Sequence, residues 1–196
     1  AMIEGRKLAL NYEHYYRNYV PGCENARMLW TSQTLGVRES RRILGDYVLN
    51  TDDFTRQAVF EDEIGRYGYP IDLHGTRPTD KWKGDSDSEL FESYCYKNPG
   101  ESYGIPYRIL LPRKLENTLV AGRCVSTDRQ MHGSIRVQAG CFITGQAAGM
   151  AAVLAAGRSV TPRRIPVAEL QAKLVKIGAF LPNFRNVQGG VSCVRH

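Results

Sequence analysis

The residues with the clearest chemical potential lie in the second half of the chain. An apolar run, Asn117–Ala121, ends in Gly122 and Arg123, and a Gly-rich stretch with the order Thr-Gly-Gln-Ala-Ala-Gly begins at Thr144. If that stretch opens a helix, its small side chains leave the unpaired backbone N–H groups accessible, and the helix dipole favours an anion there. Its glycines, Gly145 among them, also allow close packing against a sheet. Ala/Gly-rich helices without a ligand are common too, so the pattern leaves both interpretations open.

Arginine and histidine side chains supply further candidates. Four charged residues lie close together in the sequence, namely Arg38, Glu39, Arg41 and Arg42. Because guanidinium groups match planar carboxylates and phosphates, this cluster is a candidate anion site, and a surface strand with ion pairs is the alternative. His132 and Arg136 precede the Gly-rich helix and are placed to reach a substrate, and His74 is a candidate acid or base. Each histidine is equally compatible with a structural role.

Composition describes a globular chain with an uneven charge. Hydrophobic residues make up 42% of the 196 residues and charged residues 23%, which is enough for a packed core. Residues 1–112 carry a net charge of −3 and residues 113–196 one of +9. A basic half of this kind faces an anion, whether nucleic acid, a phosphate-bearing cofactor or the acidic half of the same protein. The sequence has no nucleic-acid-binding signature, and its basic residues are not interleaved with aromatics, which argues against nucleic acid as a partner.

The spacing of the cysteines and histidines does not match a metal-binding motif. The five cysteines are widely separated without a CxxC pair, so they are interpreted as small buried residues in a reducing compartment, which favours the cytoplasm. The N-terminal residues show no signal peptide. The 21 residues 137–157 carry no charge, but their apolarity rests on Ala and Gly rather than Leu, Ile and Phe. The sequence therefore predicts a buried helix of a soluble protein and no membrane contact.

Hydrophobic periodicity and Pro/Gly punctuation predict an α+β fold with a mixed or antiparallel sheet. The expected helices cover residues 2–19, 54–60, 137–157 and 167–177. The expected strands cover residues 28–34, 41–49, 64–75 with an interruption at Pro70, 103–111 and 117–121. Residues 76–101 are expected to form a long polar surface excursion, and the residues from Pro182 onward an irregular tail.

An ordered series of motifs resembles the C-terminal part of FAD-dependent oxidoreductases. The resemblance is to a bacterial group within the glutathione-reductase-like superfamily of two-domain flavoproteins. It rests on the segments NTLVAGRC (117–124), GSIRV (133–137) and GQAAG (145–149), with GVRESRR (36–42) and IPYR (105–108) upstream. The series covers roughly residues 2–180, and its order is more specific than any one motif.

The resemblance implies a fold, a cofactor and a set of contacts. Residues 1–112 would belong to a substrate domain, residues 113–181 to the last strand and Gly-rich helix of a Rossmann-like FAD-binding domain, and residues 182–196 to a tail. Gly122 and Arg123 would lie near the ribityl-pyrophosphate part of FAD, and N–H groups around Gly145 would stabilise the anionic reduced flavin. The full set of implied cofactor contacts is Gly122, Arg123, Arg136, Gly145, Gln146, Ala147 and Ala148.

The same resemblance implies what the chain does and what it needs. The function would be transfer of hydride or electrons between a small-molecule substrate and FAD, with a non-catalytic anion- or nucleic-acid-binding module as the alternative. The GxGxxG unit that binds the dinucleotide in this family does not occur in the sequence. A separate N-terminal FAD-binding half is therefore an implied partner, and the surface it would cover could instead support a homo-oligomer.

Overall fold

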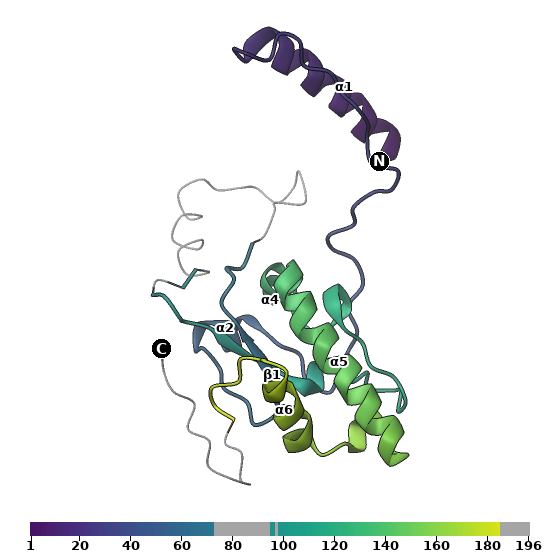
Figure 1. The fold of residues 1–196 in the computed structure, drawn as a ribbon, viewed down its shortest axis with the longest axis vertical. Coiled ribbons are helices and arrows are strands. Elements are labelled where there is room, and N and C mark those ends of the chain that lie inside the picture. The colour runs from purple at the N-terminus through teal and green to yellow at the C-terminus, as the bar shows by residue number, and fades with distance from the viewer. Residues whose placement is uncertain (73–94, 97, 185–196) are drawn as a thin grey trace. The chain divides into compact units, whose positions relative to one another are not determined.

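The chain divides into two units. The computed structural model describes residues 1–72, 95–96 and 98–184. Backbone contacts separate a first unit, Ala1–Arg38, from a second unit that begins at Glu39. Figure 1 shows the long helix α1 of the first unit in purple, and α4, α5 and α6 of the second in green to yellow. The expected boundary at residue 112, between a substrate domain and an FAD-binding domain, stays a prediction.

The first unit is one long helix followed by an extended segment. Helix α1 (Met2–Tyr19) confirms the helix expected over residues 2–19, and none of its residues is buried. Beyond the turn at Gly22, the Met28 N–H donates to the Glu13 carboxylate at 3.0 Å. The strand expected over residues 28–34 is wrong: Leu29 and Trp30 are 83% and 80% exposed, and within the described residues the segment pairs with no strand.

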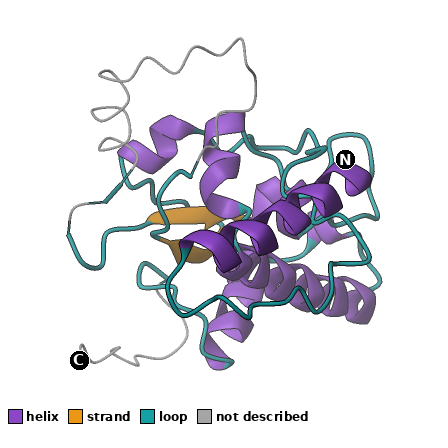
Figure 2. Cartoon of the chain, turned by 90° about the horizontal axis from the view of Figure 1, so that it is seen from above, coloured by secondary structure: helices purple, strands orange, loops and turns teal. Residues whose placement is uncertain are grey.

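The second unit is built on a two-stranded antiparallel sheet. Strand β1 (Glu63–Tyr67) pairs with β2 (Tyr103–Pro106), and the register places Tyr67 opposite Tyr103. Figure 2 shows the two strands in orange among the purple helices. Helices combined with a small antiparallel sheet agree with the α+β class that the sequence predicts.

Two helices cover this sheet and enclose the core. Helix α5 (Gln138–Arg158) packs on β1, where a Cβ at Gly65 would stand 2.6 Å from the side chain of Ile143. The close approach of α5 to β1 therefore requires glycine at position 65, because glycine has no side chain. Helix α6 (Val167–Lys176) packs on both α5 and β1. Both helices agree closely with the expected ranges. The buried apolar side chains that meet between helices and sheet include Ile64, Ile105, Ala147, Ala151, Leu154, Leu170 and Leu174.

Several expected elements differ in the structure. Residues 41–49 form only isolated bridges, at Gly45 with Pro112 and at Leu49 with Thr127. The run 103–111 leaves the sheet at Pro106 and continues as a 3-10 helix, η1 (Tyr107–Leu110). Residues 117–121 are not a buried strand but a partly exposed segment without strand structure. Proline at positions 106 and 112 explains part of this, since it has no N–H to donate to a neighbouring strand.

Two short helices also depart from expectation. Helix α2 (Thr51–Thr55) begins earlier than the expected helix 54–60, because Asn50 and Asp53 form a reciprocal capping box at its start. Helix α4 (Arg129–Ile135) occupies a stretch expected to be a loop, and Asp128 caps it by accepting the Met131 N–H at 2.6 Å. Residues 76–94 of the expected surface excursion and the tail from residue 185 lie outside the described residues.

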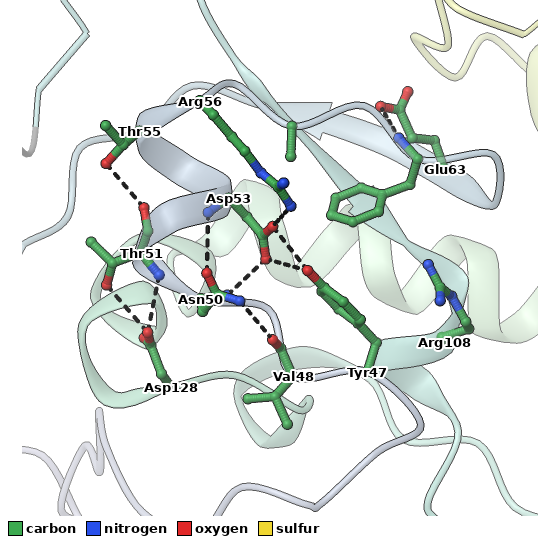
Figure 3. Close-up of polar contacts among 12 residues, drawn as sticks. Tyr47, Val48, Asn50, Thr51, Asp53, Thr55, Arg56, Glu63, Arg108 and Asp128 are labelled. Atoms are coloured by element: carbon green, nitrogen blue, oxygen red, sulfur yellow. Dashed lines mark hydrogen bonds and ion pairs between the residues drawn. The ribbon is translucent and has the colours of Figure 1, made fainter.

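A buried network of polar groups fixes α2 against α4. The Asp53 carboxylate is fully buried and accepts hydrogen bonds from the Tyr47 hydroxyl at 2.8 and 2.9 Å and from Arg56 at 2.5 Å (Figure 3). Asp128 accepts from both the backbone N–H and the hydroxyl of Thr51, at 3.0 and 3.2 Å. One aspartate thus caps α4 and holds the first turn of α2.

The backbones of α4 and α5 lie in close contact at the junction between the two helices. A Cβ at Gly140 would overlap the carbonyl oxygen of Ile135, the last residue of α4. By contrast, a Cβ at Gly145 meets nothing within 4 Å. Only glycine therefore fits at position 140, whereas position 145 faces open space.

Replacing Asp128 should destabilise the fold through both helices. The substitution Asp128→Ala removes the cap of α4 and the oxygen that accepts from both the N–H and the hydroxyl of Thr51, and we expect the free energy of unfolding to fall by about 1–3 kcal/mol. Urea denaturation followed by circular dichroism measures this change. Asp52, an exposed aspartate in the first turn of α2, provides the control. The substitution Asp52→Ala should change the free energy of unfolding by no more than about 0.5 kcal/mol. Equal effects of the two substitutions would contradict the linking role of Asp128.

Gly140 and Gly145, two of the four glycines of α5, should respond in opposite directions to the same substitution. Gly140→Ala forces a methyl group into the α4 backbone and should cost about 1–3 kcal/mol. Gly145→Ala adds a methyl group in open space and should stabilise the helix by about 0.5–1 kcal/mol. Thermal and urea unfolding of both variants measures the difference. A stabilised Gly140→Ala protein would show that the junction is placed incorrectly.

Candidate functional site

The Gly122–Cys124 turn lies at the surface but is held by buried side chains. This turn is a 3-10 helix, η2 (Gly122–Cys124), in which Arg123 and Cys124 are exposed. The Gly122 N–H donates to the Thr144 hydroxyl of α5 at 3.0 Å. His132 Nε2 of α4 lies 2.8 Å from the Arg123 carbonyl oxygen. Because a carbonyl only accepts, Nε2 carries the proton in this contact.

Glycine is required where the turn begins. Gly122 has φ +72°, in the left-handed region that side chains disfavour, and a Cβ there would stand 3.9 Å from the Cys141 thiol. Burial raises the pKa of Cys141, and the nearby Arg123 opposes this shift. The turn therefore approaches the first turns of α5 closely, and the expected contact of Gly122 and Arg123 with FAD stays a prediction.

Arg136 has a different place from the one its predicted cofactor contact requires. It lies at the end of α4, and its side chain is only 3% exposed. The guanidinium lies 3.3 Å from the Glu39 carboxylate and donates to the Asp72 carbonyl oxygen at 3.0 Å. In this structure Arg136 joins three segments of the chain and is not open to a ligand. No local pattern predicts these partners, because they are 97 and 64 residues away in the sequence.

His132 is buried, and it does not reach outward to a substrate. The ring is 1% exposed in α4, and burial lowers its pKa from the ordinary value of 6.5. The nearby Arg42 and Arg136 lower the pKa further, whereas the Arg123 carbonyl and Glu39 raise it. The imidazole is therefore held neutral in the folded protein near neutral pH.

The other expected substrate residues are Arg38, Arg41 and His74, and the first two lie in different units. Arg38 is exposed at the end of the first unit, and Arg41 is exposed in the second unit. Arg42 donates to the Thr127 carbonyl oxygen at 3.1 Å, and Glu39 faces Arg136. These contacts favour the alternative of structural pairing for Glu39 and Arg42. His74 lies outside the described residues.

Helix α5 begins earlier than the Gly-rich motif suggests. Its first residue is Gln138, seven residues before Gly145, and Val137 supplies no side-chain cap. The N–H groups of Gln138 and Ala139, both exposed, have no carbonyl within the helix to accept them. The anion-favouring end of α5 is therefore here, and the expectation that it lies around Gly145 is wrong. Glycine at an exposed position of a continuing helix gave the misleading signal.

The four expected contacts within α5 lie on different sides of the helix. Gly145 and Gln146 are exposed, Ala148 is half-buried, and Ala147 is fully buried in the core. Their N–H groups belong to the interior of the helix and bond to preceding carbonyls. Gly145 and Gln146 are thus the two that can contact anything outside the unit.

The outer side of α5 is apolar, uncharged and exposed. Phe142 and Val153 are 67% and 69% exposed, and Gly145 and Gly149 between them leave open space around their Cα atoms. By length and composition α5 could cross a membrane, although its inner side packs on α6 and β1. We call the exposed residues Gln138, Ala139, Phe142, Gly145, Gln146, Gly149, Ala152, Val153 and Ala156 the outer face of α5.

Comparison with known proteins identifies the family. The model of the FAD dependent oxidoreductase family matches residues 1–174. Comparisons with curated proteins and with solved structures give no match. The family match includes the Gly122 turn, α4, α5 and most of α6. It covers well over half of the 196 residues. The chain therefore belongs to the FAD-dependent oxidoreductase family, whose members are oxidoreductases with FAD as cofactor.

Proposed function

We propose that the chain forms one wall of a flavin site that transfers hydride between a small-molecule substrate and FAD. In this proposal α5 is the last Gly-rich helix of a Rossmann-like FAD-binding domain in the glutathione-reductase-like superfamily. The observation that carries it is the combination, on one helix, of an uncapped N-terminus beside the Gly122 turn and an uncovered outer face. The family match gives this combination its interpretation.

The described residues fit part of FAD. The unpaired N–H groups of Gln138 and Ala139 suit the negative charge of a reduced flavin ring, since both lie at the positive end of a 21-residue helix. Gly122 and the exposed Arg123 suit the ribityl-pyrophosphate portion, because a guanidinium pairs well with phosphate. When bound, the flavin supplies the two-electron chemistry. The chain's own groups would orient it and stabilise its charge.

A second unit must supply the remaining contacts. The sequence contains no GxGxxG, the motif whose glycines let a helix start approach a pyrophosphate. The outer face of α5 is the surface on which such a unit would dock, because α/β domains bury helices of this kind against a sheet. Without that unit, the exposed Phe142 and Val153 would favour self-association of the chain. Nothing in the comparisons favours the alternative of a nucleic-acid-binding module.

The chain on its own should bind FAD weakly. A helix terminus contributes about 0.3–2 kcal/mol toward an anion, whereas micromolar affinity needs about 8 kcal/mol. Titration of FAD with the 196-residue chain, followed by flavin fluorescence, should show no saturation in the low micromolar range. Addition of a GxGxxG-bearing FAD-binding unit should raise the affinity. Sub-micromolar binding by the monomeric chain alone would contradict the proposal.

A large side chain at Gly145 should block docking without unfolding the chain. Gly145→Leu points into open space, so the melting temperature of the chain should not fall. In complex with the FAD-binding unit, the same leucine would separate α5 from the surface it contacts, and flavin content should drop at least several-fold. Gly5→Leu is the matched control, because Gly5 is a helical glycine with nothing within 4 Å of its Cβ position. Full flavin content in the Gly145→Leu complex would contradict this placement.

A further inference from the structure

The Gly122–Cys124 turn is exposed, yet two buried side chains on two different helices hold its backbone. Thr144 and His132 are almost completely buried, and they bond to adjacent residues of the turn. Thr144 accepts the N–H of Gly122, and His132 donates to the carbonyl of Arg123. A short surface turn rarely needs such support, because water can satisfy its backbone groups.

Thr144 is itself oriented by the helix that carries it. Its hydroxyl lies 3.0 Å from the Gly140 carbonyl oxygen and 3.1 Å from that of Cys141, and it donates to these acceptors. The hydroxyl proton is therefore engaged, and a lone pair is left to accept the Gly122 N–H. The Gly140 region in turn cannot move, because its backbone is in contact with the end of α4.

His132 is oriented by its burial in α4. The helix is capped by Asp128, and its Ser134 hydroxyl donates to the Tyr69 carbonyl oxygen at 2.6 Å and bonds to the buried Tyr103 hydroxyl at 2.9 Å. These contacts fix α4 against the segment after β1 and against β2. Because α4 is held in place, the backbone of His132 is fixed, and its Nε2–H points toward the Arg123 carbonyl.

We propose that His132 is a positioning residue for the flavin reaction. Together with Thr144 it holds the Gly122–Cys124 turn in one conformation, so that the side chain of Arg123 is presented to FAD in a fixed orientation. The inference rests on the proposed function, because it takes the turn as a cofactor contact. It differs from a substrate role, since the ring is 1% exposed and its Nε2 donates to a backbone carbonyl.

We call the two hydrogen bonds by which His132 and Thr144 hold the Gly122–Cys124 turn the clamp. The clamp requires a hydrogen-bond donor at the position of His132 Nε2, and a side chain of the same volume without that donor is not enough. A leucine could fill the space of the imidazole, but it would leave the Arg123 carbonyl without its partner. Glutamine would place an amide N–H near the position of Nε2 and would restore the donor. The two substitutions therefore separate hydrogen bonding from packing.

Protonation of His132 gives a second way to test the clamp. Burial of the ring lowers the pKa of His132. The charges of Arg42 and Arg136 lower it further, and Glu39 raises it. In the closed state the pKa therefore lies below 6.5. When the turn opens and the ring is hydrated, the ordinary pKa returns. Proton uptake therefore favours the open turn: the clamp is fully closed above pH 6.5, and opening rises as the pH falls below that value. The change is about tenfold for each unit by which the two pKa values differ.

Hydrogen–deuterium exchange of the amides of residues 122–125 in the whole chain tests the clamp directly. After correction for the intrinsic rate, His132→Leu should exchange roughly 2- to 10-fold faster than the wild type at pH 7.5, as expected for the loss of one buried hydrogen bond. His132→Gln should stay protected and should lose the rise in exchange below pH 6.5. His14→Gln, at an exposed position of α1, should behave as the wild type. Unchanged exchange in His132→Leu would overturn the clamp.

FAD affinity measured in the complex with the FAD-binding unit tests the positioning role. His132→Leu should weaken FAD binding several-fold, His132→Gln should rescue it, and only the wild type should lose affinity below pH 6.5. Normal FAD affinity in His132→Leu, with fast exchange of the turn, would overturn the positioning role while leaving the clamp intact. If no form binds FAD, the proposed function fails and the positioning role with it, and the exchange data still decide whether the clamp exists.

Discussion

The packing of α5 across the sheet and α6 is the constraint on which the rest of the second unit depends. Gly65 lets the helix reach β1, and Leu154 meets Leu170 and Leu174 in the core. Burial of each such leucine stabilises the fold by about 1.5–3 kcal/mol. Because the inner side of α5 is committed to this core, its outer face is left for contacts beyond the unit.

That placement of α5 also decides where chemistry can occur. The helix brings Cys141 and Thr144 next to the Gly122 turn, and the His132 side chain of α4 bonds to the next residue of the same turn. The tight junction at Gly140 fixes the distance between the two helices. A backbone turn, a helix terminus and an exposed arginine thus come together through packing, although the residues that fix them touch no ligand.

The sequence predicted the long elements well and the local geometry poorly. Helices α1, α5 and α6 have clear hydrophobic periodicity, so they were predictable. The strand expected at 117–121 was not formed, because an apolar run of five residues cannot by itself select a partner strand. The unpaired N–H groups of α5 were expected around Gly145 and lie instead at Gln138, since GQAAG looks like a helix start and Val137 gives no capping signal. The partners of Arg136 and the role of Thr144 arise from long-range contacts, which no local pattern encodes.

In the proposed flavin site, a dinucleotide-binding unit covers the outer face of α5. A cysteine introduced by Gly149→Cys, labelled with a maleimide and located by mass spectrometry, reports directly on this face, where position 149 opens onto free space. We expect rapid labelling at position 149 in the chain alone and strong protection in the FAD-loaded complex. Equally rapid labelling in both states would contradict the account.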